Sequence, residues 1–306
     1  IFSGTWLYAA GITTSTGKGQ DGLGIRIADY GLSLAAAWQT PYWGSDRDED
    51  LWGLAVDASQ RLWLYGTSDA STDGSWSSGD WLVVANGWNG AAMGYRPVSN
   101  KIGVLGVGRN ARIAGQTAHL CGALQNTHAY VATLNVANCD STPVDTCLAD
   151  AVYELNDSAY QTEFRDIVPV AAGGWYASGF RALNADLSQS QGMVWQLDAS
   201  GTIVNSFPAP HSGARDILQA LAVDGAGGVY ACGIEGYAGG GTNTGDAVCY
   251  KLGATLQKVW KFTHATASLD LFAGVNVAQN GMIYVSGSTG DALIVKKCDS
   301  NGNCGN

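Results

Sequence analysis

The chain has 306 residues, is 46% hydrophobic and 14% charged, and contains 42 Gly but only 6 Pro. This composition supplies a large core and excludes intrinsic disorder. A formal net charge of −10 without any Lys/Arg cluster argues against nucleic-acid or anionic-lipid partners, and no apolar run approaches the roughly 20 residues that span a bilayer, so we expect no membrane insertion.

Short β-rich runs that end on Gly recur along the whole chain. Residues 62–66 read Leu-Trp-Leu-Tyr-Gly, and residues 283–287 read Ile-Tyr-Val-Ser-Gly. In chain order the runs end on Gly11, Gly66, Gly115, Gly179, Gly233 and Gly287. A strand-only repeat of about 50 residues is typical of a β-propeller, in which each sheet covers its neighbours.

Each repeat contains further strands around its run. An apolar segment that ends in a turn precedes it, as in residues 221–224 before the Gly-rich turn 225–228. A polar loop and a strand such as residues 79–84 follow, and a last strand such as residues 202–204 comes after another turn. We therefore predict an all-β fold, with six repeats of a four-stranded blade (strands A to D) in a single β-propeller domain over residues 1–306.

The repeat resembles a bacterial β-propeller repeat family. Each unit of that family begins with Asp-x-x-x-x, a hydrophobic residue and Ala-Val-Asp. A Gly, the motif Tyr-Val-x-Gly and the motif Gly-x-x-Asp follow in that order. The resemblance covers essentially the whole chain and is strongest around Gly66, Gly233 and Gly287, whereas the repeat around Gly115 lacks the Tyr and carries an insertion. It implies a propeller and an exported protein, but it implies little about activity, because one fold serves many functions.

The first and last repeats are predicted to be incomplete. Only residues 1–3 precede Gly4, so the first repeat begins near strand B, and Cys304 would only open strand D of the last. Proteins avoid open sheet edges, so we expect either a chain cut from a longer precursor or strand complementation by another chain or segment. The alternative is that short irregular ends close the sheet.

Six of the seven cysteines fall into pairs whose positions suit disulfides, and Cys121 is left over. Two pairs flank turn-rich loops, and the third lies on strands B and C of one repeat. The pairs are Cys139 with Cys147, Cys298 with Cys304, and Cys232 with Cys249. Disulfides persist in oxidising compartments, so we expect an extracellular or periplasmic protein.

Four repeats carry an Asp at the predicted start of strand A, near the mouth of the central channel. These residues are Asp50, Asp166, Asp216 and Asp270. Converging carboxylates can bind a hard cation such as Ca²⁺ or supply acid/base groups. The favoured interpretation is structural: each Asp recurs with the repeat and accepts hydrogen bonds from its own turn. We expect no cofactor, Ca²⁺ being the one ion that these residues suit.

A long polar loop over residues 67–79 contains Trp76, which is the best aromatic candidate for a ligand-binding platform. The same composition also fits a surface loop that tolerates changes in its sequence.

The sequence lacks the His-Glu-x-x-His, Gly-x-Ser-x-Gly and P-loop motifs. We therefore expect a non-enzymatic binding or assembly module that recognises a glycan or a protein through its loop face. The alternatives are a hydrolase or lyase that uses the four carboxylates, and a filament or surface-layer subunit completed by a neighbouring strand.

Overall fold

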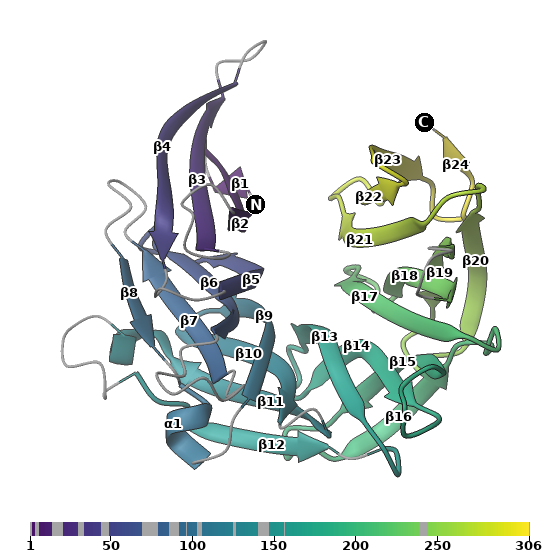
Figure 1. Ribbon diagram of the computed structural model, residues 1–306, viewed down its shortest axis with the longest axis horizontal. Helices are drawn as coiled ribbons and strands as arrows, with labels where there is room; N and C mark the ends of the chain where they lie inside the picture. Colours follow the sequence, from purple (N-terminus) through teal and green to yellow (C-terminus); the bar gives the residue numbers. More distant parts are fainter. Residues whose placement is uncertain are drawn as a thin grey trace. The chain divides into compact units, whose positions relative to one another are not determined.

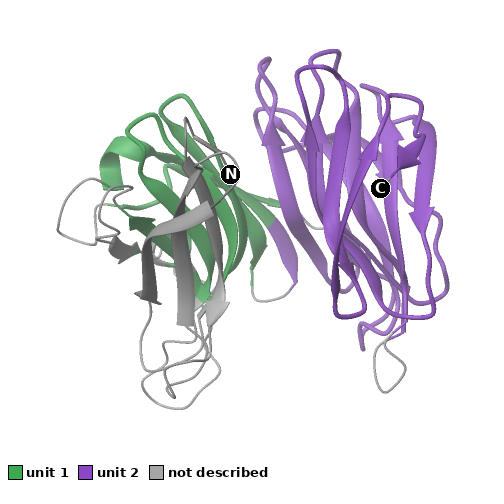
Figure 2. Cartoon of the chain, turned by 90° about the horizontal axis from the view of Figure 1, so that it is seen from above, with its two compact units in different colours: residues 1–126, 130–154 green, residues 127–129, 155–306 purple. Residues whose placement is uncertain are grey.

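A computed structural model of the chain describes residues 2–3, 6–13, 21–29, 34–43, 49–68, 79–85, 92–95, 97–102, 106–124, 127–139, 147–155, 157–238 and 244–305. The chain divides into two compact units, residues 1–126 with 130–154 and residues 127–129 with 155–306 (Figure 2). The architecture is all-β with antiparallel sheets, and strands that are consecutive in the sequence pair in runs of four (Figure 1). We number these runs sheet 1 to sheet 6.

The first three sheets occupy residues 2–155, with one helix, α1 (Ser99–Ile102), and one 3₁₀ turn, η1 (Val136–Cys139). Sheet 1 consists of β1 (Phe2–Ser3), β2 (Trp6–Thr13), β3 (Asp21–Asp29) and β4 (Leu34–Trp43). Sheet 2 consists of β5 (Glu49–Val56), β6 (Leu62–Ser68), β7 (Gly79–Ala85) and β8 (Ala92–Tyr95). Sheet 3 consists of β9 (Gly106–Ala114), β10 (Thr117–Leu124), β11 (His128–Asn135) and β12 (Ala151–Leu155).

The last three sheets belong to the second unit. Sheet 4 consists of β13 (Thr162–Pro169), β14 (Trp175–Ala182), β15 (Ser190–Leu197) and β16 (Ile203–Pro208). Sheet 5 consists of β17 (Arg215–Val223), β18 (Val229–Tyr237), β19 (Asp246–Leu252) and β20 (Lys258–His264). Sheet 6 consists of β21 (Asp270–Val277), β22 (Ile283–Thr289), β23 (Ala292–Cys298) and β24 (Cys304–Gly305).

The terminal repeats have short outer strands. Phe2 and Ser3 form β1, which pairs antiparallel with β2, so sheet 1 has a strand A of 2 residues. At the other end β24, also of 2 residues, begins at Cys304, where the sequence places the start of strand D, and it pairs with β23 at Lys297 and Cys298. The prediction that the first repeat begins near strand B omits β1, because two residues are too few to carry a strand pattern in the sequence.

The recurring Gly on strand B is required by a bulge in strand A. Opposite Gly179 the register of β13 shifts between Phe164 and Asp166, and a Cβ on Gly179 would lie 1.9 Å from the backbone oxygen of Glu163. The same contact recurs at 1.7 to 1.9 Å in the other four sheets whose side chains are described. The glycines involved are Gly66, Gly122, Gly179, Gly233 and Gly287.

Sheet 3 therefore uses Gly122, and the prediction of Gly115 at this position is wrong. Gly115 lies in the turn between β9 and β10 with φ +62°, whereas Gly122 lies in β10 opposite Gly108. With this correction the interval between successive strand-B glycines, from Gly11 to Gly287, stays between 54 and 57 residues. The repeat is more regular than the sequence pattern alone indicated.

One turn geometry recurs at the hairpin ends that join strands A to B and C to D. In the turn Asp224–Gly228 the N–H of Asp224 donates to the carbonyl of Gly228, and that of Gly227 donates to the carbonyl of Asp224. The fourth residue has a positive φ, because it forms the bulge that follows a type I turn. The same two hydrogen bonds occur in seven turns of the described residues: 57–61, 170–174, 198–202, 224–228, 253–257, 278–282 and 299–303.

The interior of each unit forms where the faces of neighbouring sheets meet. Tyr176, Val194, Leu218 and Tyr250 belong to one buried cluster from sheets 4 and 5. Tyr176 also donates from its hydroxyl to the carbonyl of Ala254 at 2.8 Å, so a side chain of sheet 4 holds a turn of sheet 5. Both faces of the middle strands are thus buried, which removes the alternation expected of half-exposed strands.

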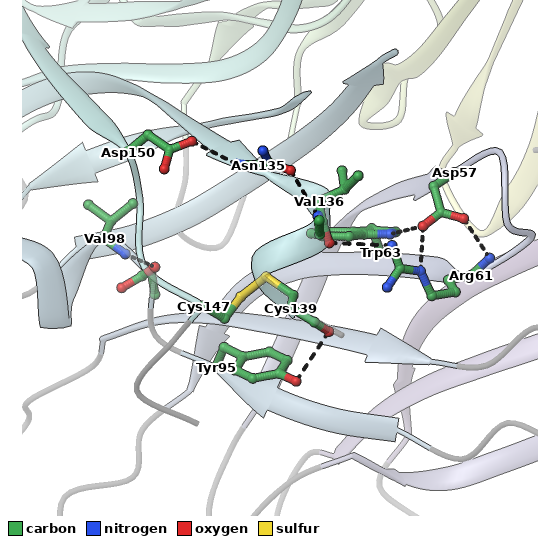
Figure 3. The surroundings of a disulfide bond; sticks show 12 residues. Asp57, Arg61, Trp63, Tyr95, Val98, Asn135, Val136, Cys139, Cys147 and Asp150 are labelled. Atoms are coloured by element: carbon green, nitrogen blue, oxygen red, sulfur yellow. Dashed lines mark hydrogen bonds and ion pairs between the residues drawn. A yellow bond between two sulfur atoms is a disulfide. The ribbon is translucent and has the colours of Figure 1, made fainter. Parts of the chain in front are cut away.

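A comparable contact in the first unit surrounds the disulfide between Cys139 and Cys147 (Figure 3). The bond closes the segment after η1, and the Tyr95 hydroxyl donates to the carbonyl of Cys139 at 3.4 Å. Arg61 donates to the carbonyl of Val136 at 3.3 Å from the turn of sheet 2. Two side chains of sheet 2 therefore hold Val136 and Cys139, at the start of the insertion that made the third repeat irregular in sequence.

Candidate functional site

The predicted site residues are distributed over both units. Trp76 lies outside the described residues. Asp50 is the second residue of β5 in the first unit and is half-buried. Asp166, Asp216 and Asp270 lie in the second unit and are buried. Only the last three can be compared with one another.

Asp216 and Asp270 occupy equivalent places, because each lies two residues before the residue that faces the strand-B glycine. Asp216 accepts hydrogen bonds from the Ser212 amide (2.8 Å), the Ser212 hydroxyl (2.5 Å) and the Gly236 amide (2.8 Å). Asp270 accepts from the Thr266 amide at 2.6 Å and from the Thr266 hydroxyl at 3.0 Å. Each carboxylate fastens the connection that precedes its own strand, which is the structural role that the repeat favoured.

Asp166 is not equivalent to these two residues. It lies two residues after Phe164, within the bulge of β13, and accepts from the Ile167 amide at 2.7 Å and from the Leu221 amide at 2.8 Å. It therefore joins sheet 4 to sheet 5 through backbone hydrogen bonds. The sequence pattern placed it with Asp216 because a bulge shifts the register without changing the residue types.

The described residues contain no group of three or more His, Cys, Asp or Glu side chains arranged to hold a metal ion. In the second unit, Asp166, Asp216 and Asp270 each have separate partners. The calcium site stays a prediction.

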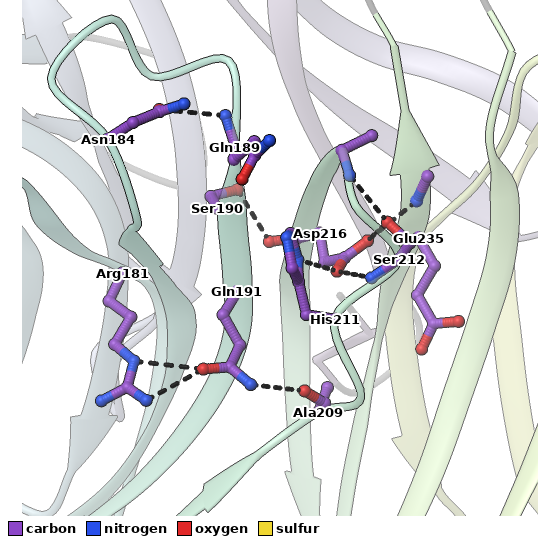
Figure 4. A network of polar contacts seen from close by, with 12 residues as sticks. Arg181, Asn184, Gln189, Ser190, Gln191, Ala209, His211, Ser212, Asp216 and Glu235 are labelled. Atoms are coloured by element: carbon purple, nitrogen blue, oxygen red, sulfur yellow. Dashed lines mark hydrogen bonds and ion pairs between the residues drawn. The ribbon is translucent and has the colours of Figure 1, made fainter.

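The most developed polar cluster lies on the loop face of the second unit, meaning the end of the sheets where strand B passes into C and D passes into A. Arg181, the penultimate residue of β14, donates from Nε (3.2 Å) and Nη2 (2.9 Å) to the side-chain oxygen of its cross-strand partner Gln191 (Figure 4). Gln191 donates in turn to the carbonyl of Ala209 at 2.8 Å. On its other side Arg181 lies 3.6 Å from the Asp157 carboxylate. We call Asp157, Arg181 and Gln191 the polar belt.

The belt continues into the connection between sheets 4 and 5. The Ser190 amide donates to the carbonyl of Ala214 at 3.2 Å, and its hydroxyl donates to the carbonyl of Asp216 at 3.1 Å. Asp216 also pairs with Nδ1 of His211 at 3.1 Å. Ser190 and Arg215 form a parallel bridge, which merges the two sheets into one of eight strands. The connection between β16 and β17 is therefore a platform held by backbone and side-chain hydrogen bonds to its neighbouring strands.

Several groups of this platform keep hydrogen-bonding capacity. Asp157 accepts from the Trp195 indole at 2.9 Å through Oδ2, and its Oδ1 accepts no hydrogen bond from the residues that the structure describes. The side chain of Arg181 is 32% exposed and that of Asp157 is 25% exposed. Tyr160, three residues after Asp157, is 44% exposed, and its amide donates to the Ser158 hydroxyl at 3.1 Å. Ser158 donates to the carbonyl of Ala182 at 2.7 Å, which fixes the Tyr160 loop beside the end of β14.

Sequence reasoning missed this cluster. Asp157, Tyr160, Arg181 and Gln191 come from three segments. The hairpin register pairs Arg181 with Gln191, and contacts of Asp157 and Ser158 with β14 add the third segment. The polar loop after β14 was an available signal, since residues 183–189 read Leu-Asn-Ala-Asp-Leu-Ser-Gln. Leu187 there has φ +58°, an uncommon conformation for a residue with a side chain.

A second polar contact on the loop face joins β18, β19 and β20. Glu235 accepts hydrogen bonds from the Tyr250 hydroxyl and from the Lys261 ammonium, the latter at 2.5 Å. Burial and the neighbouring Glu235 carboxylate raise the pKa of Tyr250 well above its usual range. Because these three side chains bond to one another, few of their donors and acceptors are available to a ligand.

The structure contains three disulfides, Cys139–Cys147, Cys232–Cys249 and Cys298–Cys304, which are the three pairs expected from the sequence. Cys121 is a buried thiol. Disulfides of this number indicate an oxidising environment. Among the described residues no helix is long and apolar enough to cross a membrane.

Comparison with known proteins bears on the fold alone. The sequence matches no protein-family model and no curated protein. A solved protein of unknown function from Bacteroides caccae is similar with a TM-score of 0.54 at 13% identity, covering 92% of this chain and 87% of that chain. A europium-containing methanol dehydrogenase (TM-score 0.48, 10% identity, 99% and 76% covered) and the C-terminal WD40 domain of Sif2 (0.43, 10%, 90% and 75%) are also similar.

Proposed function

We propose that the protein is a non-catalytic binding module of an extracellular or periplasmic space, and that it recognises a glycan or a protein through the loop face of its second unit. In this proposal the six sheets are the blades of one propeller domain over residues 1–306. The three disulfides support the compartment. The fold itself says nothing about activity.

One observation carries the proposal: the loop face presents polar side chains from segments that hydrogen bonds hold in place. Asp216 and Asp270 each fix a strand-D-to-A connection, while Asp157 and Arg181 are partly exposed and keep hydrogen-bonding capacity. A surface that is ordered before its ligand arrives loses less entropy on binding. Binding residues concentrate on such loops when a rigid scaffold positions them.

The alternative of a carboxylate enzyme has less support, because Asp216 and Asp270 are each engaged by hydrogen bonds from the connection that precedes their own strand. Strand complementation stays a prediction. It concerns β23, whose outer edge pairs with β24 only at Lys297 and Cys298.

Hydroxyl-radical footprinting tests where a ligand binds. The protein is mixed with extracellular polysaccharide and secreted protein from the producing organism, and side-chain oxidation is measured with and without each fraction. We expect protection of Tyr160, Leu183 and His211 on the loop face. Tyr284 and Val204, which lie at the opposite end of the sheets, are the internal controls, being 39% and 57% exposed. Protection of these two residues with none on the loop face, or no protection by either fraction, would overturn the proposal.

A further inference from the structure

The polar belt and Tyr160 together have the chemistry of a sugar-binding site. A sugar ring offers vicinal hydroxyls, each of which donates one hydrogen bond and accepts others, and an apolar face of C–H groups. A site for it needs an acceptor beside a donor, both with fixed geometry, and an exposed aromatic ring close by.

The acceptor and the donor are Asp157 and Arg181. The Asp157 carboxylate is held through Oδ2 by the Trp195 indole, whose side chain is fully buried, so the free Oδ1 has a fixed position. Arg181 is held by two hydrogen bonds to Gln191, and its Nη1, 3.6 Å from Asp157, donates in none of them. One hydroxyl of a diol can therefore donate to Asp157 while its neighbour accepts from Arg181, and both hydrogen bonds are charge-assisted.

The balance of charge favours a neutral ligand. Asp157 and Arg181 contribute one negative and one positive charge at adjacent positions. A phosphate or a carboxylated sugar drawn to Arg181 would meet the unshielded oxygen of Asp157, and like charges in contact are unfavourable. Uncharged hydroxyl groups satisfy both side chains without this penalty.

Tyr160 supplies the aromatic surface. Its loop is tied to β14 through Ser158 and Ala182, so the tyrosine lies on the same end of sheet 4 as the belt. It is 44% exposed, and Leu183 at the end of β14 is 38% exposed. Polar side chains lie in the loop after β14, among them Asn184, whose side-chain oxygen accepts from the backbone amide of Gln189 at 3.1 Å (Figure 4). An exposed tyrosine beside polar side chains suits a sugar better than the apolar centre of a protein interface.

We propose that Asp157, Arg181 and Tyr160 form a binding site for a neutral carbohydrate on the loop face of sheet 4. The proposal rests on the proposed function, because it names the ligand class of the same face. It predicts that Asp157 accepts a hydrogen bond from the sugar, that Arg181 donates one to it, and that Tyr160 stacks on it. Gln191 and Trp195 are positioning residues.

The test uses the full chain and an array of neutral oligosaccharides (gluco-, manno-, xylo- and chito-hexasaccharides), followed by calorimetric titration with the best binder. Tyr160→Ala should weaken binding at least about tenfold, since it removes the stacking surface. Asp157→Asn should weaken it about ten- to a hundredfold, because an amide cannot accept on both of its terminal atoms. Tyr284→Ala is the matched control, removing a tyrosine that is 39% exposed on β22; it should leave affinity unchanged.

Folding is monitored separately by the thermal midpoint of each variant, and Tyr160→Ala keeps the test valid if Asp157→Asn is unstable. Binding that resists Tyr160→Ala, or no binding to any neutral oligosaccharide, overturns the sugar site. If no sugar binds but a secreted protein protects the loop face in footprinting, the ligand class is wrong and the proposed function stands. If neither fraction protects that face, both fail.

Discussion

Replacing Gly179 by Ala should destabilise the second unit strongly, although it adds a single methyl group. The new Cβ would lie 1.9 Å from the Glu163 oxygen, whereas ordinary contact begins at 3.4 Å, so β13 must move by about 1.5 Å. A shift of this size disrupts the hydrogen bonds on either side of the bulge, each contributing about 1 kcal/mol. Overpacking costs about 1–3 kcal/mol more. After allowing for the entropy that Ala removes from the unfolded chain, we expect a loss of about 3 kcal/mol.

Gly192→Ala is the matched control, since Gly192 lies in the neighbouring strand opposite Phe180. The nearest atom to its added Cβ is Cγ of Leu218 at 3.2 Å, a side-chain atom that can yield by a few tenths of an ångström. Its cost should stay below about 1 kcal/mol. Urea unfolding followed by tryptophan fluorescence measures both variants, because Trp175 and Trp195 are buried in the same sheet. Equal destabilisation by the two substitutions would refute the bulge as the reason for the repeated Gly.

Two further predictions concern the first unit. Gln60 has φ +62° at the turn position where Gly201 serves in sheet 4, so Gln60→Gly should stabilise the protein by about 1 kcal/mol in thermal unfolding; a destabilised variant would show that its side-chain contacts outweigh the strain. Burial raises the pKa of Asp80, even though it accepts hydrogen bonds from the Ser99 and Val98 amides. The folded state therefore keeps this proton to higher pH than the unfolded chain, and the Asp80 contribution to stability should fall as pH rises above the usual Asp pKa of about 3.9. Comparing urea midpoints across pH with those of Asp80→Asn isolates this contribution, and a contribution that grows with pH would contradict the direction of the shift.

The fold could be predicted from the sequence wherever contacts within one hairpin or one loop determine it. A strand-A bulge requires Gly on strand B, and the recurring runs that end on Gly identify four of the five glycines that face such a bulge. Gly122 was missed because the run that it ends, His-Leu-Cys-Gly, lacks the tyrosine of the other repeats. Gly115, which lies nearby in a turn, was predicted in its place. The disulfides were accessible for the same reason, since each pair lies within one hairpin or one loop.

The candidate site was not accessible in this way. Asp216 and Asp270 recur because each accepts hydrogen bonds from the residue four positions earlier. In the sequence, such recurring carboxylates look the same as a set of catalytic or metal-binding residues. The belt joins Asp157 to Arg181 and Gln191 across three segments, and its formation depends on the register between β14 and β15. No short motif records such a register.

The seven identical turns have a consequence for how this protein can change over time. Each spans five residues with the same two hydrogen bonds, so an insertion there would break a geometry on which two strands depend. The connections at the opposite end already differ widely, with residues 183–189 joining β14 to β15 and only residues 290–291 joining β22 to β23. Mutation can therefore lengthen, shorten or rewrite the loop-face connections while these seven turns stay constant, and the C-to-D connection of sheet 3, residues 136–150, is an exception at the turn end. Descendants of this sequence could acquire new ligands without rebuilding the scaffold that holds them.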